Sequence, residues 1–217
     1  MANDGSEDRR LPGRPKNPVP REKLIDVARQ QFAAGGFAGT SMNDIAQNVG
    51  VRKSSLFHHF DSKNKLYQEV VLGIVRQLSE CVRDAAAFEG SYGERLDKLS
   101  TSVTDFLASQ PFAALLVVRE ALDEHLFVEA EGRALLGDAL ERVARLLEAG
   151  MKDRVLVRDD PRQVAVDIIS FLLLPFAAGG VVSRFLGADL MTGDALAARR
   201  KAVASHVRRI CGLGDSD

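Results

Sequence analysis

Cysteine is scarce in this sequence, and its spacing excludes several classes of protein. Among 217 residues only Cys81 and Cys211 are cysteines, with no CxxC pair and no histidine at the spacing of a zinc site. We therefore expect a reduced, cytoplasmic chain that has neither a metal site nor a cofactor. A redox-switch disulfide between the two thiols is the less favoured alternative.

Long hydrophobic segments are also missing. The N-terminal residues are charged and contain no apolar stretch, so no signal peptide is expected. The most apolar run, residues 168–182, contains Ser170, Pro175 and two glycines, and it is too short and too interrupted to span a membrane. It predicts a buried helix instead, and no membrane partner is expected.

Strand patterns and catalytic signatures are absent as well. After Leu66 no run alternates apolar and polar residues, and no Asn-Gly or Asp-Gly turn separates two apolar runs. Glycines and prolines instead divide this part into helical blocks that end near residues 110, 127, 150, 187 and 212. No P-loop, GxSxG, HExxH or cluster of metal ligands occurs. We therefore expect an all-α protein without catalytic residues, and an all-helical enzyme with an incidental basic region is disfavoured.

Positive charge is concentrated near the N-terminus. The chain has a formal net charge of −1, yet residues 9–60 contain nine Lys or Arg against three Asp or Glu. This segment therefore carries +6 and the remainder about −7. A basic head on an acidic body is typical of a protein that grips a nucleic acid with one end.

The residues from Met42 to Phe60 carry a helix-turn-helix pattern. Apolar residues at i, i+3, i+4 and i+7 predict a first short helix, which ends at Gly50 because glycine adopts the left-handed conformation without penalty. Leu56 and Phe60, four apart, predict the buried side of a second helix. Its outer side then carries cations, hydroxyls and imidazoles that suit the phosphates and base edges of a DNA major groove. These outer residues are Arg52, Lys53, Ser54, Ser55, His58 and His59.

Helical patterns flank this motif on both sides. An amphipathic helix precedes it and stops at Gly35-Gly36, and Ser41 has capping-box spacing at the start of the next helix. Asp61 or Ser62 is then expected to cap a long helix whose first turn carries two lysines, one of them Lys63. Because cations at that end oppose the helix dipole, they suggest a DNA phosphate nearby. A merely solvated lysine pair is the alternative.

Motif residues at fixed spacings cover this whole region. In order they are Ala28-x3-Phe32-x2-Gly35-Gly36-Phe37-x2-Thr40-Ser41-x2-Asp44-Ile45-Ala46-x2-Val49-Gly50-Val51-x-Lys53-x2-Leu56-Phe57-His58-His59-Phe60-x2-Lys63-x2-Leu66. This pattern resembles the DNA-binding domain of the TetR family of transcriptional regulators. The resemblance implies a homodimeric, one-component repressor that a small-molecule effector releases from a palindromic double-stranded DNA operator. It also implies major-groove contacts by the six outer residues named above, with Thr40, Ser41 and Lys63 on phosphates.

Three residues depart from the usual pattern of the family. Arg52 stands where a small capping serine is usual, which suggests a phosphate or guanine contact instead. Ser54 replaces a frequent glycine. Phe57 replaces the usual tyrosine, so that the tyrosine's hydroxyl contact to a phosphate is lost or taken over by a neighbour. These departures leave the operator sequence unpredicted.

The first residues of the chain have a composition of their own. Residues 1–19 are polar and proline-rich, which predicts a disordered N-terminal arm. Within the arm, Pro12-Gly13-Arg14-Pro15-Lys16 resembles an AT-hook core, in which Arg14 enters the narrow minor groove of A·T-rich DNA. A solubilising tail is the alternative.

The length of the chain fits two folded domains. We expect a DNA-binding domain over residues 20–66 and a helical effector-binding and dimerisation domain over residues 67–217. The family resemblance implies that the last two long helical blocks pair with those of a second copy, and burial within one subunit is the alternative. The same fold without a small-molecule effector would suit a nucleoid-organising protein, which is the alternative function.

Aromatic residues of the C-terminal blocks are candidates for an apolar effector pocket. Pro175 is expected to kink its helix and open space beside it. Arg119 follows an apolar run and is the candidate polar contact, although a paired or exposed Arg119 is the alternative. The candidate pocket residues are Phe106, Phe112, Arg119, Phe127 and Phe171.

Overall fold

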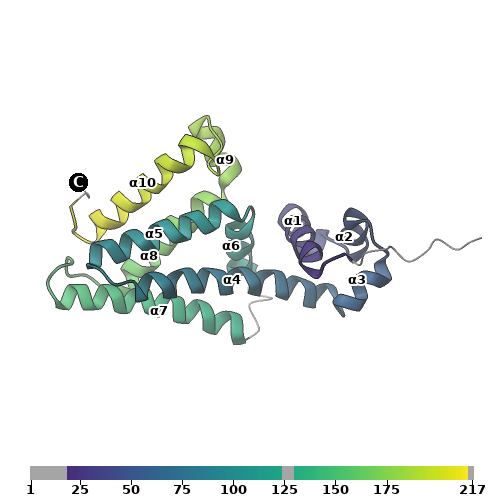
Figure 1. Ribbon diagram of the computed structural model, residues 1–217, viewed down its shortest axis with the longest axis horizontal. Coiled ribbons are helices and arrows are strands. Elements are labelled where there is room, and N and C mark those ends of the chain that lie inside the picture. The colour runs from purple at the N-terminus through teal and green to yellow at the C-terminus, as the bar shows by residue number, and fades with distance from the viewer. Residues whose placement is uncertain (1–18, 124–129, 215–217) are drawn as a thin grey trace, which may run out of the picture.

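Ten helices and no strand make up the part of the chain that the computed structural model describes, residues 19–123 and 130–214 (Figure 1). The predicted all-α class is confirmed for these residues. The helices are α1 (Arg21–Gly39), α2 (Met42–Val49), α3 (Lys53–His59), α4 (Lys63–Ala87), α5 (Tyr92–Ser109), α6 (Ala113–Asp123), α7 (Ala130–Lys152), α8 (Pro161–Ala177), α9 (Gly179–Leu186) and α10 (Gly193–Ile210).

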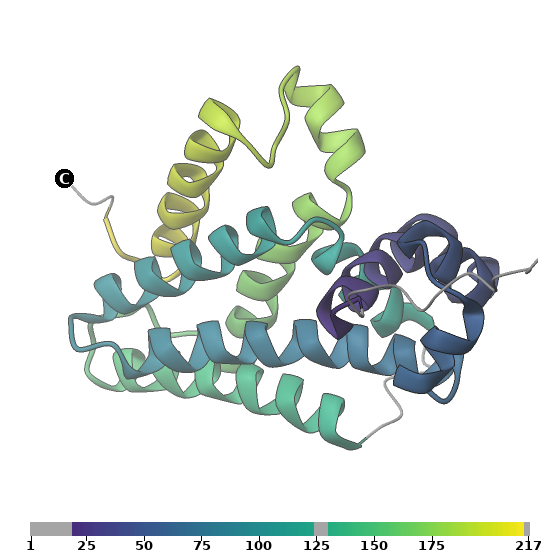
Figure 2. The same cartoon turned by 45° about the vertical axis from the view of Figure 1, so that its right-hand side comes forward.

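The helices form a small head and a larger body joined by one long helix. α1, α2 and α3 lie together at one end of the molecule, and α4 begins in this head and runs on through the body (Figure 1). In the body α5 and α7 pack along α4, and α8 and α10 pack on α5 (Figure 2). α6 is short and contacts α1, α4 and α8, so it touches both parts.

Side-chain caps begin several helices where the sequence predicts them. The Ser41 and Ser62 hydroxyls accept hydrogen bonds from the backbone N–H groups of Asp44 and Lys65, which starts α2 and α4. Asp160 caps α8 in the same way, ahead of proline at the first helical position. The predicted start points of α2 and α4 are therefore confirmed.

The core of the head comes from the apolar stripes of its helices and of α4. Phe37 lies over this core, with its ring centroid 6.2 Å from that of Phe32 and 5.2 Å from that of Tyr67. Burying each large side chain contributes about 1.5–3 kcal/mol. The fully buried side chains include Leu24, Ala28, Phe32, Ile45, Leu56 and Leu66.

Helix α1 departs from the expected end at Gly35-Gly36. Gly36 has φ 69° and ψ 178°, which breaks the helical path, but the helical assignment continues to Gly39 beyond this kink. Only glycine adopts such a conformation without strain. The two glycines therefore mark the break correctly, and a further helical turn follows it.

The helical block that is expected to end near residue 187 is two helices, α8 and α9, rather than one. α8 ends at Ala177 and α9 begins at Gly179, with a bend of 79° between them. Pro175 lies inside α8 two residues before its end, where it removes a backbone donor, and Gly179-Gly180 weakens the helix further. The prediction of one helix over this block is wrong, because the chain bends after Ala177 and not only at Pro175, where a kink is expected.

The expected domain boundary after residue 66 falls inside α4, which runs unbroken from Lys63 to Ala87. Tyr67 packs edge-on against Phe32 and Phe37 of the head, and α4 also contacts α5, α6 and α7 of the body. The two domains therefore share one helix, so rotation of the head is coupled to this helix.

No single helix within residues 19–123 and 130–214 is long and apolar enough to cross a membrane. Two consecutive pairs, α5 with α6 and α8 with α9, reach the required length and apolar composition together, but they are bent by 99° and 79°.

Candidate nucleic-acid interface

The turn between α2 and α3 sets the orientation of α3 relative to α2. Gly50 adopts the left-handed conformation, with φ 78°, and its N–H donates to Gln47 O at 3.0 Å. The Val51 N–H donates to Ala46 O at 2.9 Å, which closes the end of α2. A side chain at position 50 would be strained, so the turn depends on glycine.

Helix α3 is held by one apolar side and exposes the other. Leu56 is fully buried, and Phe60 just after the helix is 2% exposed. Ser55 is half-buried, and Phe57 is 41% exposed beside the polar residues. The remaining polar positions that the sequence assigned to DNA are exposed together on this side: Arg52, Lys53, Ser54, His58 and His59.

The exposed side of α3, with Arg52 before it, is positively charged. No Asp or Glu occurs between Arg52 and Phe60, so no carboxylate on the helix neutralises its two cations. The Lys53 Nζ lies 5.8 Å from the centroid of the Phe57 ring. Arg52 begins the helix without a side-chain cap, as the sequence indicates. These residues can donate to phosphates and base edges, and their DNA contacts stay a prediction.

Ser41 is exposed, and its hydroxyl already serves α2. It accepts from the Asp44 N–H at 3.1 Å and donates to Asp44 Oδ2 at 2.7 Å. A contact from Ser41 to a phosphate stays a prediction, although it would compete with the second of these bonds. Arg14 lies outside the described residues.

Thr40 and Lys63 have structural roles that the sequence analysis missed. Thr40 is 4% exposed, and its hydroxyl donates to Gln31 O at 2.9 Å and Gly36 O at 2.8 Å. The Lys63 Nζ donates to Phe37 O at 2.9 Å and Thr40 O at 3.1 Å. Within the subunit the Thr40 hydroxyl and the Lys63 ammonium therefore bind backbone carbonyls at the α1–α2 turn, and their contacts to phosphates stay predictions. No sequence signal separates these inward directions from outward ones.

The predicted effector-pocket residues that the structure describes have different surroundings. Phe112 is 44% exposed, and Phe171 stacks on His206 with ring centroids 4.1 Å apart. Arg119 donates to backbone carbonyls of α1, and Phe106 is half-buried against the core. Phe127 lies outside the described residues. These contacts give no support to one pocket formed by these side chains, and the effector pocket stays a prediction.

Two hollows in the body lie elsewhere. The larger, about 1010 Å³, lies between the end of α7 and the start of α8, with lining residues that include Arg145, Met151, Arg158 and Pro161. The smaller, about 230 Å³, is lined in part by Ala86, Arg95 and Leu146. None of the predicted pocket residues lines either hollow. Within the described ranges no group of three or more His, Cys, Asp or Glu side chains is placed to hold a metal ion.

Three polar side chains are buried inside the body. Ser100 and Thr104, one turn apart on α5, are 1% and 0% exposed, and Glu120 on α6 is 1% exposed. Burying a carboxylate is costly unless polar groups surround it, so these side chains mark the polar part of an otherwise apolar interior. The sequence gives a signal for them, because each interrupts an apolar helical stripe.

Comparisons with known proteins match both halves of the chain. The family model described as "Bacterial regulatory proteins, tetR family" matches residues 24–70, and "Tetracyclin repressor-like, C-terminal domain" matches residues 93–207. The chain is 43% identical over 51 residues to the biofilm operon icaADBC HTH-type negative transcriptional regulator IcaR of Staphylococcus aureus strain Newman, which is 24% of this chain and 27% of that protein. The chain thus spans about a quarter of the length of this relative.

A longer match and two structural likenesses extend this result. The HTH-type transcriptional repressor KstR2 of Rhodococcus jostii is 31% identical over 137 residues, which is 61% of this chain and 66% of that protein. The regulator PfmR of Thermus thermophilus superposes with a TM-score of 0.72 at 18% identity, covering 88% of this chain and 97% of that one. FadR of Bacillus halodurans, a fatty acid degradation regulator, gives a TM-score of 0.66 at 20% identity over 89% and 96%.

The structural likenesses show a shared fold, and the family assignment rests on the sequence matches. The C-terminal model alone covers more than half of the chain, and it follows the N-terminal model in the same order as the body follows the head. The chain therefore belongs to the tetR family of bacterial regulatory proteins.

Proposed function

We propose that this chain is a homodimeric DNA-binding repressor that a small molecule releases from a palindromic operator. The observation that carries the proposal is the exposed, acid-free side of α3, held in place by the buried Leu56 and Phe60. A rigid helix with cations and hydrogen-bond donors outward matches the width of the DNA major groove. Such a protein would act on the nucleoid, in the cytoplasm.

The roles of the side chains follow from their positions. Lys53, His58 and His59 face outward along α3 and would read base edges, while Arg52 at its start would contact a phosphate or a guanine. Ser54 and Ser55 add hydroxyl donors. Phe57, which lacks a hydroxyl, would contribute apolar contact to sugars or thymine methyl groups. Arg14 would extend the contact into the minor groove.

Apolar side chains exposed on the body support the dimer. Val166 and Leu174 on α8 are 49% and 60% exposed, and Val181 and Phe185 on α9 are 64% and 87% exposed. None of the residues of α9 is buried within the subunit. An apolar surface of this kind marks an interface, and a second copy of the chain would place two heads on two half-sites.

The effector would enter the body, where α8 packs against both α5 and α6. Ser100, Thr104 and Glu120 are the buried polar and charged side chains of the described part of the body. A small molecule with polar groups could bond with them while its remainder contacts apolar residues. Binding would favour one separation of the two heads over another and so change operator affinity.

Selection from a randomised double-stranded DNA library tests the proposal. The full-length protein should enrich an inverted repeat whose two halves are spaced by about one or two helical turns. A genome-wide footprint should then show few sites, near promoters. If the selection enriches no sequence, the proposal that the protein binds a specific operator is contradicted. If the footprint shows many dispersed sites, a nucleoid-organising protein of the same fold is favoured instead.

A further inference from the structure

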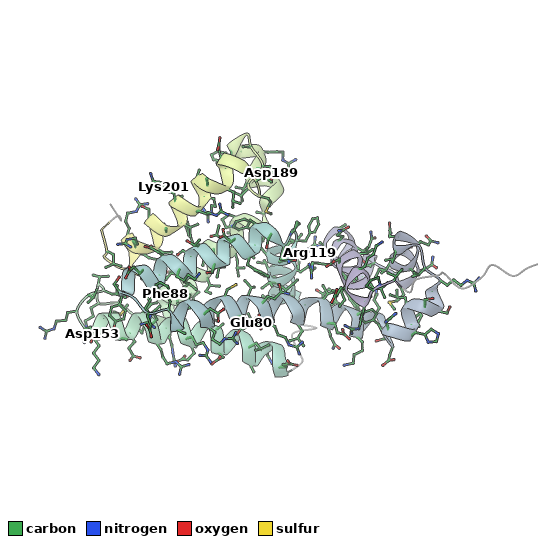
Figure 3. All side chains as sticks on the ribbon, in the orientation of Figure 1. Glu80, Phe88, Arg119, Asp153, Asp189 and Lys201 are labelled. Atoms are coloured by element: carbon green, nitrogen blue, oxygen red, sulfur yellow. The ribbon has the colours of Figure 1, made fainter. Side chains whose placement is uncertain are left out.

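Two arginines join the head to the body near the end of α1. Arg119 on α6 donates from Nη1 to Ala33 O at 2.6 Å and to Phe32 O at 3.3 Å. Arg29 on α1 donates from Nη1 to Gln110 Oε1, in the α5–α6 turn, at 2.5 Å. Both arginines are half-buried, and Figure 3 labels Arg119 where α6 faces α1. Hydrogen bonds therefore join the head both to the turn before α6, through Gln110, and to α6 itself, through Arg119.

The carbonyls bound by Arg119 belong to a helix end. Phe32 and Ala33 lie in the last turn before Gly36 breaks the helical path. Carbonyls in the last turn of a helix lack intrahelical partners and carry partial negative charge. α1 has no basic residue of its own in its last turn. The body thus supplies, through a permanently charged guanidinium, a cap that α1 does not supply itself.

The same helix end positions the start of α2. Thr40 donates to Gln31 O and Gly36 O, next to the carbonyls that Arg119 binds, and Ser41 after it caps α2. Lys63 at the start of α4 donates to Phe37 O and Thr40 O. A displacement of this helix end therefore moves α2, and with it α3.

The other end of the connection is a constrained turn. Phe112, just before α6, has φ 74°, a conformation that bulky side chains rarely adopt. The Ala113 N–H donates to Gln110 O at 3.1 Å, and the Leu116 N–H donates to Phe112 O at 2.9 Å. Gln110, the acceptor for Arg29, is therefore held in place by the turn that begins α6.

We propose that Arg119, assisted by Arg29, is a positioning residue that sets the orientation of the head on the body. This inference rests on the proposed function, since in a dimer the orientation of each head fixes the spacing of the two recognition helices. Arg119 touches α1 and not the DNA-reading side of α3. Its removal should therefore change which half-site spacing is preferred, and leave the bases that are read unchanged.

The experiment compares full-length wild type with Arg119→Gln on duplexes selected from a randomised library by the wild type. The spacer between half-sites is lengthened or shortened by one or two base pairs. Wild type should prefer one spacing, and Arg119→Gln should bind that duplex about tenfold more weakly while it binds random DNA as before. The variant should also lose most of the discrimination between spacings. Arg76→Gln is the matched control, because Arg76 pairs on the surface with Glu131 within the body.

The outcomes separate the inference from the proposed function. An unchanged spacing preference, or an equal loss of affinity at every spacing, overturns the positioning role of Arg119. If wild type selects no sequence, the proposed function is overturned and the inference with it. Thermal unfolding checks that each variant is folded, and Arg29→Gln, which breaks the other bond, replaces Arg119→Gln if the latter does not fold. Arg29→Gln should relax the spacing preference in the same direction, and its failure to do so also contradicts the inference.

Discussion

Lys53 and Phe57 lie one turn apart on the exposed side of α3, and the Phe57 ring limits the positions open to the lysine side chain. The ammonium lies 5.8 Å from the ring centroid, close enough for a weak cation–π attraction that leaves it hydrated. The ring therefore narrows the positions that the lysine samples before any ligand arrives. Less side-chain entropy is then lost on binding than for a lysine on an open surface.

Replacement of Lys53 by alanine should weaken operator binding by about 1–3 kcal/mol if the lysine contacts a base. The measurement is the affinity for a selected duplex and for random DNA at one salt concentration, because phosphate contacts depend strongly on salt. Lys201→Ala is the control, since Lys201 is exposed on α10 in the body (Figure 3). An equal loss on both DNAs would show a phosphate contact only.

Replacement of Thr40 by valine should act on stability rather than on DNA contact. Valine keeps the shape of the buried side chain but removes the donor to Gln31 O and Gly36 O, which should cost about 1–3 kcal/mol. The free energy of unfolding in urea measures this cost, and Thr40→Ser, which keeps the hydroxyl, should lose less. If Thr40→Val is as stable as wild type and binds the operator more weakly, the phosphate contact that the sequence predicts is supported instead.

Thr40, Lys63 and Arg119 show why the sequence can locate a polar residue without revealing its partner within the fold. Sequence spacing locates each of them near a helix end or beside an apolar run. It does not reveal whether the polar group points outward or back to a carbonyl, because that depends on which helix end lies opposite. The break at Gly36 leaves backbone carbonyls without helical partners. Thr40 donates to one of them, and Arg119, more than eighty positions further along the chain, donates to another.

Helix α5 begins with a complete capping box, and this element should make the body sensitive to acid. The Ser91 hydroxyl accepts from the Glu94 N–H. The Ser91 N–H and the Ser91 hydroxyl each donate to Glu94 Oε2 at 2.8 Å. These hydrogen bonds, from the backbone first and the hydroxyl second, lower the pKa of the Glu94 carboxyl below its ordinary value. Because the pKa is lower in the folded state, the ionised form stabilises the fold.

The stabilisation by Glu94 should be present at neutral pH and should fade as the pH falls through the ordinary carboxyl range and then through the lowered pKa. Replacement of Glu94 by glutamine should therefore flatten part of the dependence of unfolding free energy on pH below about pH 5. Urea unfolding across that range measures it, with Glu80→Gln on α4 as an exposed control. Ser91→Ala should lower stability by about 1 kcal/mol. A pH profile that is the same in Glu94→Gln and wild type would contradict this account.

Among the helices, the sequence predicts those with caps and clear stripes better than those with uniform apolar composition. α2 begins and ends where Ser41 and Gly50 indicate, and α4 begins where Ser62 indicates. The α8–α9 region is apolar on all sides, so periodicity does not show the bend of 79° at Ala178. Only the combination of Pro175 with Gly179-Gly180 signals it, and each of these features also occurs in unbroken helices.

The exposed chemistry of the whole molecule is divided between its two ends. Cations and imidazoles lie on α3 in the head, and large exposed apolar side chains gather on α8 and α9 in the body. One α3 contacts only a few base pairs, so a single copy would bind DNA weakly and with little selectivity. In the proposed dimer, pairing of two bodies would supply the second head without any change in the first.

Replacement of Phe185 by aspartate should separate the dimer and leave the subunit folded. The side chain is 87% exposed in the single subunit, so its loss removes almost no intramolecular contact, whereas a charge buried in an interface would cost more than about 2 kcal/mol. Sedimentation equilibrium should show monomers for the variant and dimers for wild type, and the affinity for an inverted repeat should fall toward that for a half-site. Phe88→Asp, at 43% exposure between α4 and α5, is the matched control and should remain dimeric. A dimeric Phe185→Asp with unchanged operator affinity would place the interface elsewhere, and it would leave the exposed side of α9 without a partner.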